Sequence, residues 1–161
     1  MTRKREEGST LLETLIAATI AGVAFVGTMG AVEVAARFVR QADLVTQAQA
    51  VAQSRLEAKR AVGWKFLLED DVDRDGVPDT VMRDDGQDPD MAAGDGVYSA
   101  MAEHRGLTEV WTIEGHRSGP LASVGMVTIR SIVTFEGWKG RRELRMETMR
   151  ANPAFVGRAQ W

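Results

Sequence analysis

The chain has 161 residues, 23 acidic and 20 basic side chains, a net charge of −3 and no cysteine. This length suits one domain with an added anchor, and it is too short for two full domains. Without cysteine, a disulfide framework, a thiolate zinc site and a cysteine nucleophile are all excluded.

The charge is distributed unevenly along the chain. Residues 69–95 contain eleven of the 23 acidic residues and only two basic ones, so this segment carries −9 and the remainder +6. Such separation argues against a general nucleic-acid surface, which needs clustered Lys and Arg. It favours a local site built from oxygen ligands, and we expect no nucleic-acid partner.

Residues 14–32 contain nineteen positions without a charge. About 20 residues of helix cross a bilayer, so one membrane span is expected here. Basic residues precede the span at positions 3–5, which predicts a cytoplasmic N-terminus and an extracytoplasmic head. The many Ala, Gly and Thr residues favour close contact with other helices. A cleaved secretory signal is the less favoured alternative, because the apolar pattern continues into an amphipathic helix.

The stretch "GSTLLETLIAATIAG", residues 8–22, resembles the N-terminal signature of the type IV pilin and pseudopilin family. The resemblance implies a leader of residues 1–8, cleavage after Gly8 by a prepilin peptidase, N-methylation, and a mature chain starting at Ser9. The family usually has Phe where Ser9 stands. Glu13 becomes the fifth residue of the mature protein.

The resemblance also implies a role for Glu13, which otherwise places a carboxylate at the start of an apolar run. In such filaments this glutamate pairs with the N-terminal amine of a neighbouring subunit. Two unit charges at ~4 Å attract by ~4 kcal/mol at an effective dielectric of 20, which favours the correct register. The alternative is a carboxylate that reaches the cytoplasmic headgroups and has no assembly role.

Downstream of the span, the sequence predicts an amphipathic helix. Apolar residues recur at steps of three and four, whereas Arg and Gln residues occupy the other positions. No helix breaker separates the span from this segment, so we expect one long helix over residues 9–62. The apolar positions are Val34, Phe38, Val45, Ala48, Val51, Ala52 and Leu56, and the polar ones are Arg37, Arg40, Gln41, Gln47 and Arg55.

The remaining residues, 63–161, predict a β-rich head. Residues 108–114 and 123–136 are rich in β-formers, and "GWKG" at 137–140 predicts a hairpin turn into a further strand. The expected fold class is α+β and pilin-like: a long helix, half transmembrane and half amphipathic, packed on an antiparallel sheet. A group of arginines near the end, interleaved with glutamates, is expected to form a solvent-facing ladder: Arg141, Arg142, Arg145 and Arg150.

The acidic segment contains "DVDRDGVPD" at residues 71–79, which matches the first nine positions of an EF-hand-type calcium loop. The predicted ligands are Asp71, Asp73, Asp75, the Val77 carbonyl and Asp79. Position twelve is Met82, so the bidentate glutamate is missing. A second ion near Asp84, Asp85, Asp88 and Asp90 is a further possibility, and a turn-rich loop without metal is the alternative for both segments.

The two histidines, His104 and His116, fit no zinc-ligand or triad spacing, and both are expected at the surface. We expect no enzyme. The resemblance implies a minor pilin, or a minor pseudopilin of type II secretion, in the inner membrane, with its head periplasmic or extracellular. Its partners are other subunits, contacted through the N-terminal helix. The rival reading is a stand-alone membrane-anchored calcium-binding or adhesive domain.

Overall fold

The computed structural model describes residues 6–73, 75–116 and 120–155. A single helix, α1, covers Glu6–Ala61. It therefore begins three residues before the expected start at residue 9 and ends one residue before 62. The basic residues at 3–5 lie outside the described residues. The chain divides into two compact units, residues 1–42 and 43–161.

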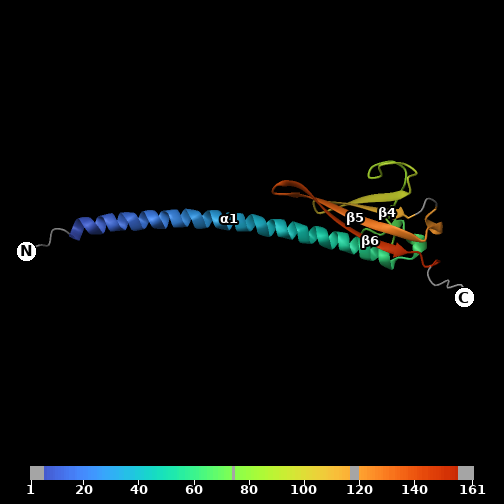
Figure 1. Cartoon of the computed structure of the whole chain (residues 1–161), viewed down its shortest axis with the longest axis horizontal. Helices are drawn as coiled ribbons and strands as arrows, with labels where there is room; N and C mark the ends of the chain where they lie inside the picture. The colour runs from blue at the N-terminus through green and yellow to red at the C-terminus, as the bar shows by residue number, and fades with distance from the viewer. Residues whose placement is uncertain (1–5, 74, 117–119, 156–161) are drawn as a thin grey trace, which may run out of the picture. The chain divides into compact units, whose positions relative to one another are not determined.

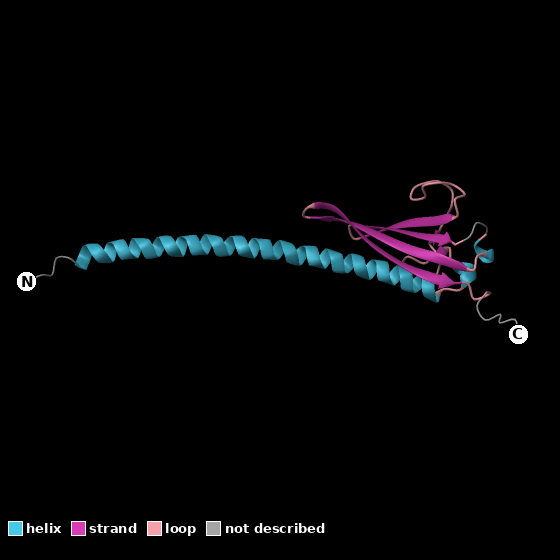
Figure 2. Ribbon diagram, viewed as in Figure 1, coloured by secondary structure: helices cyan, strands magenta, loops and turns pink. Residues whose placement is uncertain are grey.

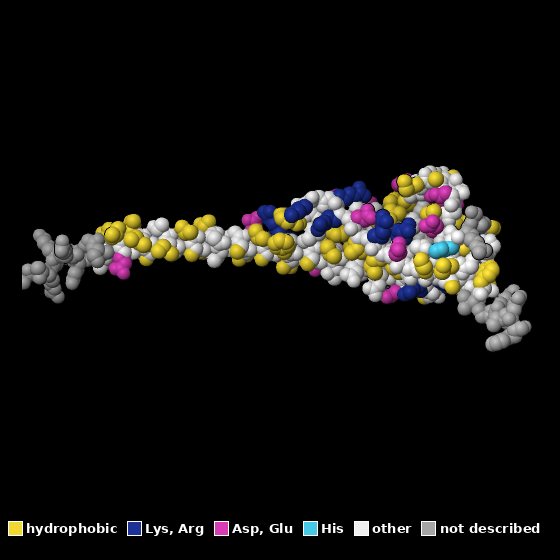
Figure 3. Space-filling view, viewed as in Figure 1, with side chains coloured by type: hydrophobic (Ala, Val, Ile, Leu, Met, Phe, Trp, Pro, Cys, Tyr) yellow, Lys and Arg dark blue, Asp and Glu magenta, His cyan; other side chains and the backbone are white. Residues whose placement is uncertain are grey.

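The described part of the first unit is helical, and hydrophobic side chains are spread along the face of it that Figure 3 shows. Every side chain from Thr10 to Arg40 is exposed. The hydroxyls of Thr14, Thr19 and Thr28 bond to carbonyls three or four residues earlier, which satisfies these polar groups within the helix. Of the described helices, α1 is long and apolar enough to cross a membrane, with a mean hydropathy of 2.0 in its most apolar window.

The second unit combines the end of α1 with two antiparallel sheets (Figures 1 and 2). The larger has four strands in the order β3-β4-β5-β6, so each strand pairs with the next in the chain, and β3 and β6 form the edges. The smaller pairs β1 with β2. The strands are β1 (Glu69–Asp70), β2 (Thr80–Val81), β3 (Val97–His104), β4 (Leu107–Gly115), β5 (Met126–Gly137) and β6 (Gly140–Ala151).

The C-terminal part of α1 packs on one face of the larger sheet. Near one end, Ala48 and Ala52 pack against a cluster that includes Leu107 and Phe135. Towards the other end, Leu56 joins the cluster around Trp111. Side chains on β4 and β5 alternate between this covered face and the opposite one, as period-two strands require. The expected α+β layout of helix on antiparallel sheet is confirmed.

The strands expected at 108–114 and 123–136 correspond to β4 and β5, and the strand after the "GWKG" turn corresponds to β6. The expected strand start at 123 is three residues early, because Leu121–Ser123 forms a short 3-10 helix. β3 lies outside the strands expected from the sequence, the first of which begins at residue 108. Pairing with β4 along its whole length, from Val97 to His104, stabilises β3.

Arg150 differs from the expected solvent-facing ladder. Its guanidinium donates hydrogen bonds to the carbonyl oxygens of Lys59 (2.5 Å) and Val62 (2.6 Å). The last four carbonyls of a helix lack partners within the helix, and Arg150 satisfies carbonyls at this end of α1. Arg141, Arg142 and Arg145 are exposed as expected.

We therefore expect Arg150→Met to destabilise the head by about 2 kcal/mol, because it removes two charge-assisted hydrogen bonds while keeping a long apolar stem. Thermal unfolding of the full chain in detergent, followed by near-ultraviolet circular dichroism, measures the change. Arg141→Met is the matched control and should change stability by less than about 0.5 kcal/mol. Equal effects of the two substitutions would contradict the role of Arg150 at the helix end.

Candidate functional site

The predicted calcium loop lies between β1 and β2. These two strands pair Glu69 with Val81 and Asp70 with Thr80, so the two ends of the loop between them lie side by side. The loop of residues 71–79 is thereby closed at its base. Gly76 has a φ of +93°, a conformation that favours glycine, and its N–H donates to Asp71 Oδ2 at 2.8 Å.

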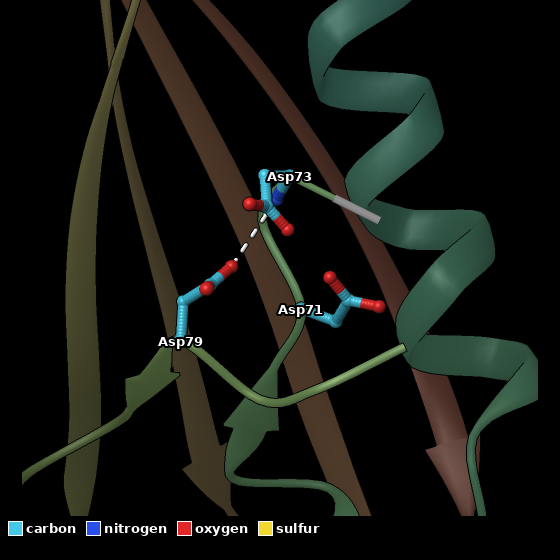
Figure 4. A group of neighbouring side chains, drawn as sticks. All are labelled: Asp71, Asp73 and Asp79. Atoms are coloured by element: carbon cyan, nitrogen blue, oxygen red, sulfur yellow. Dashed lines mark hydrogen bonds between the residues drawn. The ribbon is translucent and has the colours of Figure 1, made fainter. Parts of the chain in front are cut away.

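Three of the predicted carboxylates come together in this loop. One oxygen from each of Asp71, Asp73 and Asp79 lies within 4.8 Å of the other two. Asp79 also binds the loop backbone, accepting N–H groups from Val72 (2.7 Å) and Asp73 (3.2 Å); the second of these bonds is drawn in Figure 4. Asp79 therefore joins the two sides of the loop.

Asp75, the fourth predicted carboxylate, is not placed in this group. Asp75 Oδ1 accepts the N–H of Val77 at 2.8 Å, and the Asp75 N–H in turn donates to Asp71 and Asp73. Three carboxylates at this spacing form an all-oxygen donor set, which suits a hard cation such as Ca²⁺. The residues present therefore fit a cation, with Asp71, Asp73 and Asp79 as its protein ligands.

A second group of carboxylates forms in the following loop, from Asp84, Asp90 and Asp95. Asp84 accepts the N–H groups of Gly94 (2.5 Å), Asp95 (3.2 Å) and Gly96 (2.9 Å), and Asp90 is buried. Of the four residues proposed from the sequence, Asp85 and Asp88 do not belong to this group. Asp95 was missed, because the contact joins residues eleven apart in a loop without regular spacing.

A pocket of about 430 Å³ lies beside the first loop. Its walls come from α1, from Asp71 to Asp73, and from His104 and Glu109 on β3 and β4. His104 Nε2 is 3.2 Å from Glu109 Oε2, and the His104 side chain is 29% exposed, so it reaches the surface as expected but is less exposed than His116. His116 is exposed as expected.

Behind this pocket lies a network of buried charges from α1, β1 and β4. Arg55, Lys59, Asp70 and Glu109 are 8%, 1%, 5% and 1% exposed. Arg55 donates to Asp70 Oδ1 at 2.9 Å and to Glu109 Oε2 at 3.1 Å. Its guanidinium also stacks over the ring of Trp111, 3.8 Å from the centroid. The positive charges of Arg55 and Lys59 thus balance the negative charges of Asp70 and Glu109 within the core.

The remaining members of the network satisfy the two carboxylates. Lys59 Nζ lies 2.8 Å from Asp70 Oδ2 and donates to the Leu67 carbonyl at 2.6 Å. Trp111 Nε1 donates to Asp70 Oδ2 at 2.8 Å, and Ser131 donates to Glu109 Oε1 at 2.9 Å. Burial lowers the pKa of Lys59, and the neighbouring Asp70 carboxylate opposes that shift.

The sequence interpretation placed Arg55 on the polar side of the helix, which is wrong. Arg55 and Lys59 share the stripe of Ala48, Ala52 and Leu56 that faces the sheet. Glu109 lies between Leu107 and Trp111 at alternate positions of β4, and all three side chains are buried on the face of the strand that is turned to the core. The sequence does contain a signal for this network: charged residues stand at core-facing positions of both α1 and β4. The network anchors Asp70, the residue that immediately precedes the first loop ligand.

At the N-terminal end, the backbone of Gly8 and Ser9 is helical, as part of α1. The side chain of Glu13 is exposed. No hydrogen bond or ion pair links Glu13 to another residue in the part of the chain that the structure describes.

We expect Glu109→Gln to destabilise the head by about 3–5 kcal/mol, because it removes the negative charge that balances buried Arg55. Urea unfolding of the full chain in detergent measures the change. Glu143→Gln, an exposed glutamate on β6, is the control and should change stability by less than about 0.5 kcal/mol. A loss from Glu109→Gln no larger than the control's would contradict a balanced network.

Comparison with known proteins brings no assignment to this site. No family model, no curated protein and no solved structure matches the chain. The functional argument therefore depends on the residues themselves: an exposed apolar helix with one carboxylate near its start, a head fixed to the end of that helix, and two groups of aspartates.

Proposed function

We propose that this chain is a minor pilin or minor pseudopilin, a structural subunit that primes or caps a type IV pilus or a type II secretion pseudopilus. The observation that carries the proposal is the position of Glu13, five residues after Gly8, at the start of an apolar helix whose surface is exposed. The precursor sits in the inner membrane and is cut after Gly8 by a prepilin peptidase.

The first support is the exposed surface of α1. Between Leu11 and Val39, thirteen large apolar side chains are 50–71% exposed. A helix that is apolar on all sides is stable when lipid or other helices surround it, because each exposed apolar side chain costs free energy in water. Both a bilayer and a filament of packed N-terminal helices would cover these apolar side chains. A pilin lies first in the bilayer and then in the filament.

The second support is the carboxylate of Glu13, which pairs with none of the residues that the structure describes. Cleavage after Gly8 creates a positive amine at Ser9, and a neighbouring subunit brings that amine to Glu13. The pair is favourable by ~4 kcal/mol at ~4 Å and an effective dielectric of 20, and it costs this energy when the register slips. Glu13 then selects the position of one subunit against the next.

The third support is the way the head is joined to the helix. The same α1 that carries the apolar surface continues to Ala61 and packs on the four-stranded sheet. A subunit that packs laterally through its helix therefore also positions its head in the assembly. The alternative, a stand-alone anchored domain, needs the helix only as a membrane anchor and does not require Glu13.

We expect the protein recovered from its native host to begin at Ser9. Glu13→Leu should remain in the membrane but fall at least tenfold in the sheared filament fraction, because the pairing energy is lost. Mass spectrometry of the N-terminus and immunoblots of membrane and filament fractions measure both results. Glu33→Leu, an exposed glutamate further along α1, is the control and should assemble normally.

Two outcomes would overturn this function. An N-terminus at Met1, or one beyond residue 25, would exclude prepilin processing. Normal display of Glu13→Leu, with no filament fraction for either protein, would favour the stand-alone anchored domain.

We further propose that calcium stabilises the head through Asp71, Asp73 and Asp79. The three carboxylates repel one another until a cation is bound, and the loop begins directly after Asp70, which the buried network anchors. Binding therefore closes a loop whose base is already fixed. Affinity of ~10⁻⁴–10⁻³ M is sufficient for an extracellular calcium module.

With such an affinity, 10 mM calcium should stabilise the head by about 1.4–2.7 kcal/mol and raise its Tm by several degrees. Differential scanning calorimetry of the full chain in detergent, with calcium or with chelator, measures the shift. Asp73→Asn should abolish most of it, whereas Asp88→Asn, which belongs to neither aspartate group, should retain it. An unchanged Tm with chelator would show that the loop needs no ion.

A further inference from the structure

The turn between β5 and β6 combines a tryptophan with a group of basic side chains. Gly137 pairs with Gly140, so Trp138 and Lys139 form a two-residue turn, and Gly140 has a φ of +102°. Trp138 is 51% exposed, and Lys139 Nζ lies 4.7 Å from the centroid of its ring. Arg141 and Arg142 follow and are exposed. We name Trp138, Lys139, Arg141 and Arg142 the hairpin tip.

The hairpin tip lies at the end of the head where α1 enters. Phe135, just before the tip, belongs to the cluster with Ala48, against which Leu44 also packs. At the other end of the same strands, Arg150 binds the carbonyls of Lys59 and Val62, where α1 ends. The turn of the β5–β6 hairpin therefore lies towards the start of the second unit, and the other end of the hairpin lies where α1 ends.

That end of the head is the one closest to the membrane along the chain. Asp43, the first residue of the second unit, comes eleven residues after Val32, the end of the uncharged run. A helix covers about 16 Å over that length. This step rests on the proposed function, because it requires that α1 spans the bilayer before assembly.

The chemistry of the hairpin tip fits lipid headgroups. Tryptophan is enriched at membrane–water interfaces, where its ring lies among the headgroups and its N–H stays hydrated. Lys and Arg are attracted to anionic lipids over a distance of about one Debye length. Residues 136–142 contain three basic side chains and one acidic one, and Lys and Arg side chains gather around this end of the sheet in Figure 3.

The acidic loop of residues 84–96 lies away from this surface. It leads into Val97, which pairs with Glu114, and Glu114 pairs with Thr128. These residues lie at the end of the sheet opposite the hairpin turn. Within the head, the second aspartate group and the hairpin tip therefore lie at opposite ends of the sheet.

We propose that the hairpin tip docks on the anionic phospholipid headgroups of the bilayer that holds α1, and that it keeps the head against the membrane until the subunit is assembled. Trp138 enters the interface, and Lys139, Arg141 and Arg142 bind the lipid phosphates. Assembly into a filament would then have to release this contact, so lipid composition would influence how readily the subunit leaves the bilayer.

The test uses the full chain, one subunit per lipid nanodisc, with and without phosphatidylglycerol. Lipids brominated near the headgroup quench tryptophan fluorescence, and the difference between the native chain and Trp138→Phe isolates Trp138 from the other three tryptophans. We expect quenching of Trp138 that increases at least threefold with phosphatidylglycerol and decreases in high salt. The combined variant Lys139→Gln, Arg141→Gln, Arg142→Gln should remove this increase.

Matched controls keep the result specific. Arg130→Gln with Arg145→Gln, on the same hairpin but away from its turn, should leave the quenching unchanged. Glu13→Leu should also leave it unchanged, so a failed assembly does not affect this readout. A chain that does not incorporate into nanodiscs would instead contradict the membrane span. No quenching of Trp138, or equal quenching without anionic lipid, would overturn docking on lipid.

Discussion

The contact between Asp70 and three groups, Arg55, Lys59 and Trp111, is the interaction on which the head depends. A buried carboxylate is tolerated only when its charge is balanced and its oxygens accept hydrogen bonds. Here the donors come from α1 and β4, while the acceptor lies on β1. The helix, the large sheet and the base of the aspartate loop are therefore held in one register, since sliding any of them would leave a charge buried without a partner.

This constraint separates the chain into parts with different requirements. Residues 43–61 of α1 are held by the head, through apolar clusters at two levels and through the charged network between them. Residues 10–40 are exposed, and their stability must come from surroundings outside the chain. The same secondary structure element thus meets a protein core in one part and, in our proposal, lipid or neighbouring helices in the other. A filament subunit needs this combination.

Much of this architecture could be predicted from sequence patterns. The long helix followed from the absence of breakers, β4 and β5 from alternating apolar residues, and the loop carboxylates from the spacing of Asp71, Asp73 and Asp79. The burial of Arg55 and Lys59 could not, because a charge is read as exposed until its partners are known. Asp95 and β3 depend on contacts between distant positions, which no local period records.

The edge strand β6 has a further consequence for contacts between copies of the chain. An open strand edge invites pairing with a second sheet, which leads to aggregation. On β6, Arg141, Glu143, Arg145 and Glu147 alternate along one face, and all four are exposed. A second copy of β6 pairing in parallel and in register would set each of these charges opposite a like charge. The alternating charges therefore disfavour that edge-to-edge pairing between two copies of the chain.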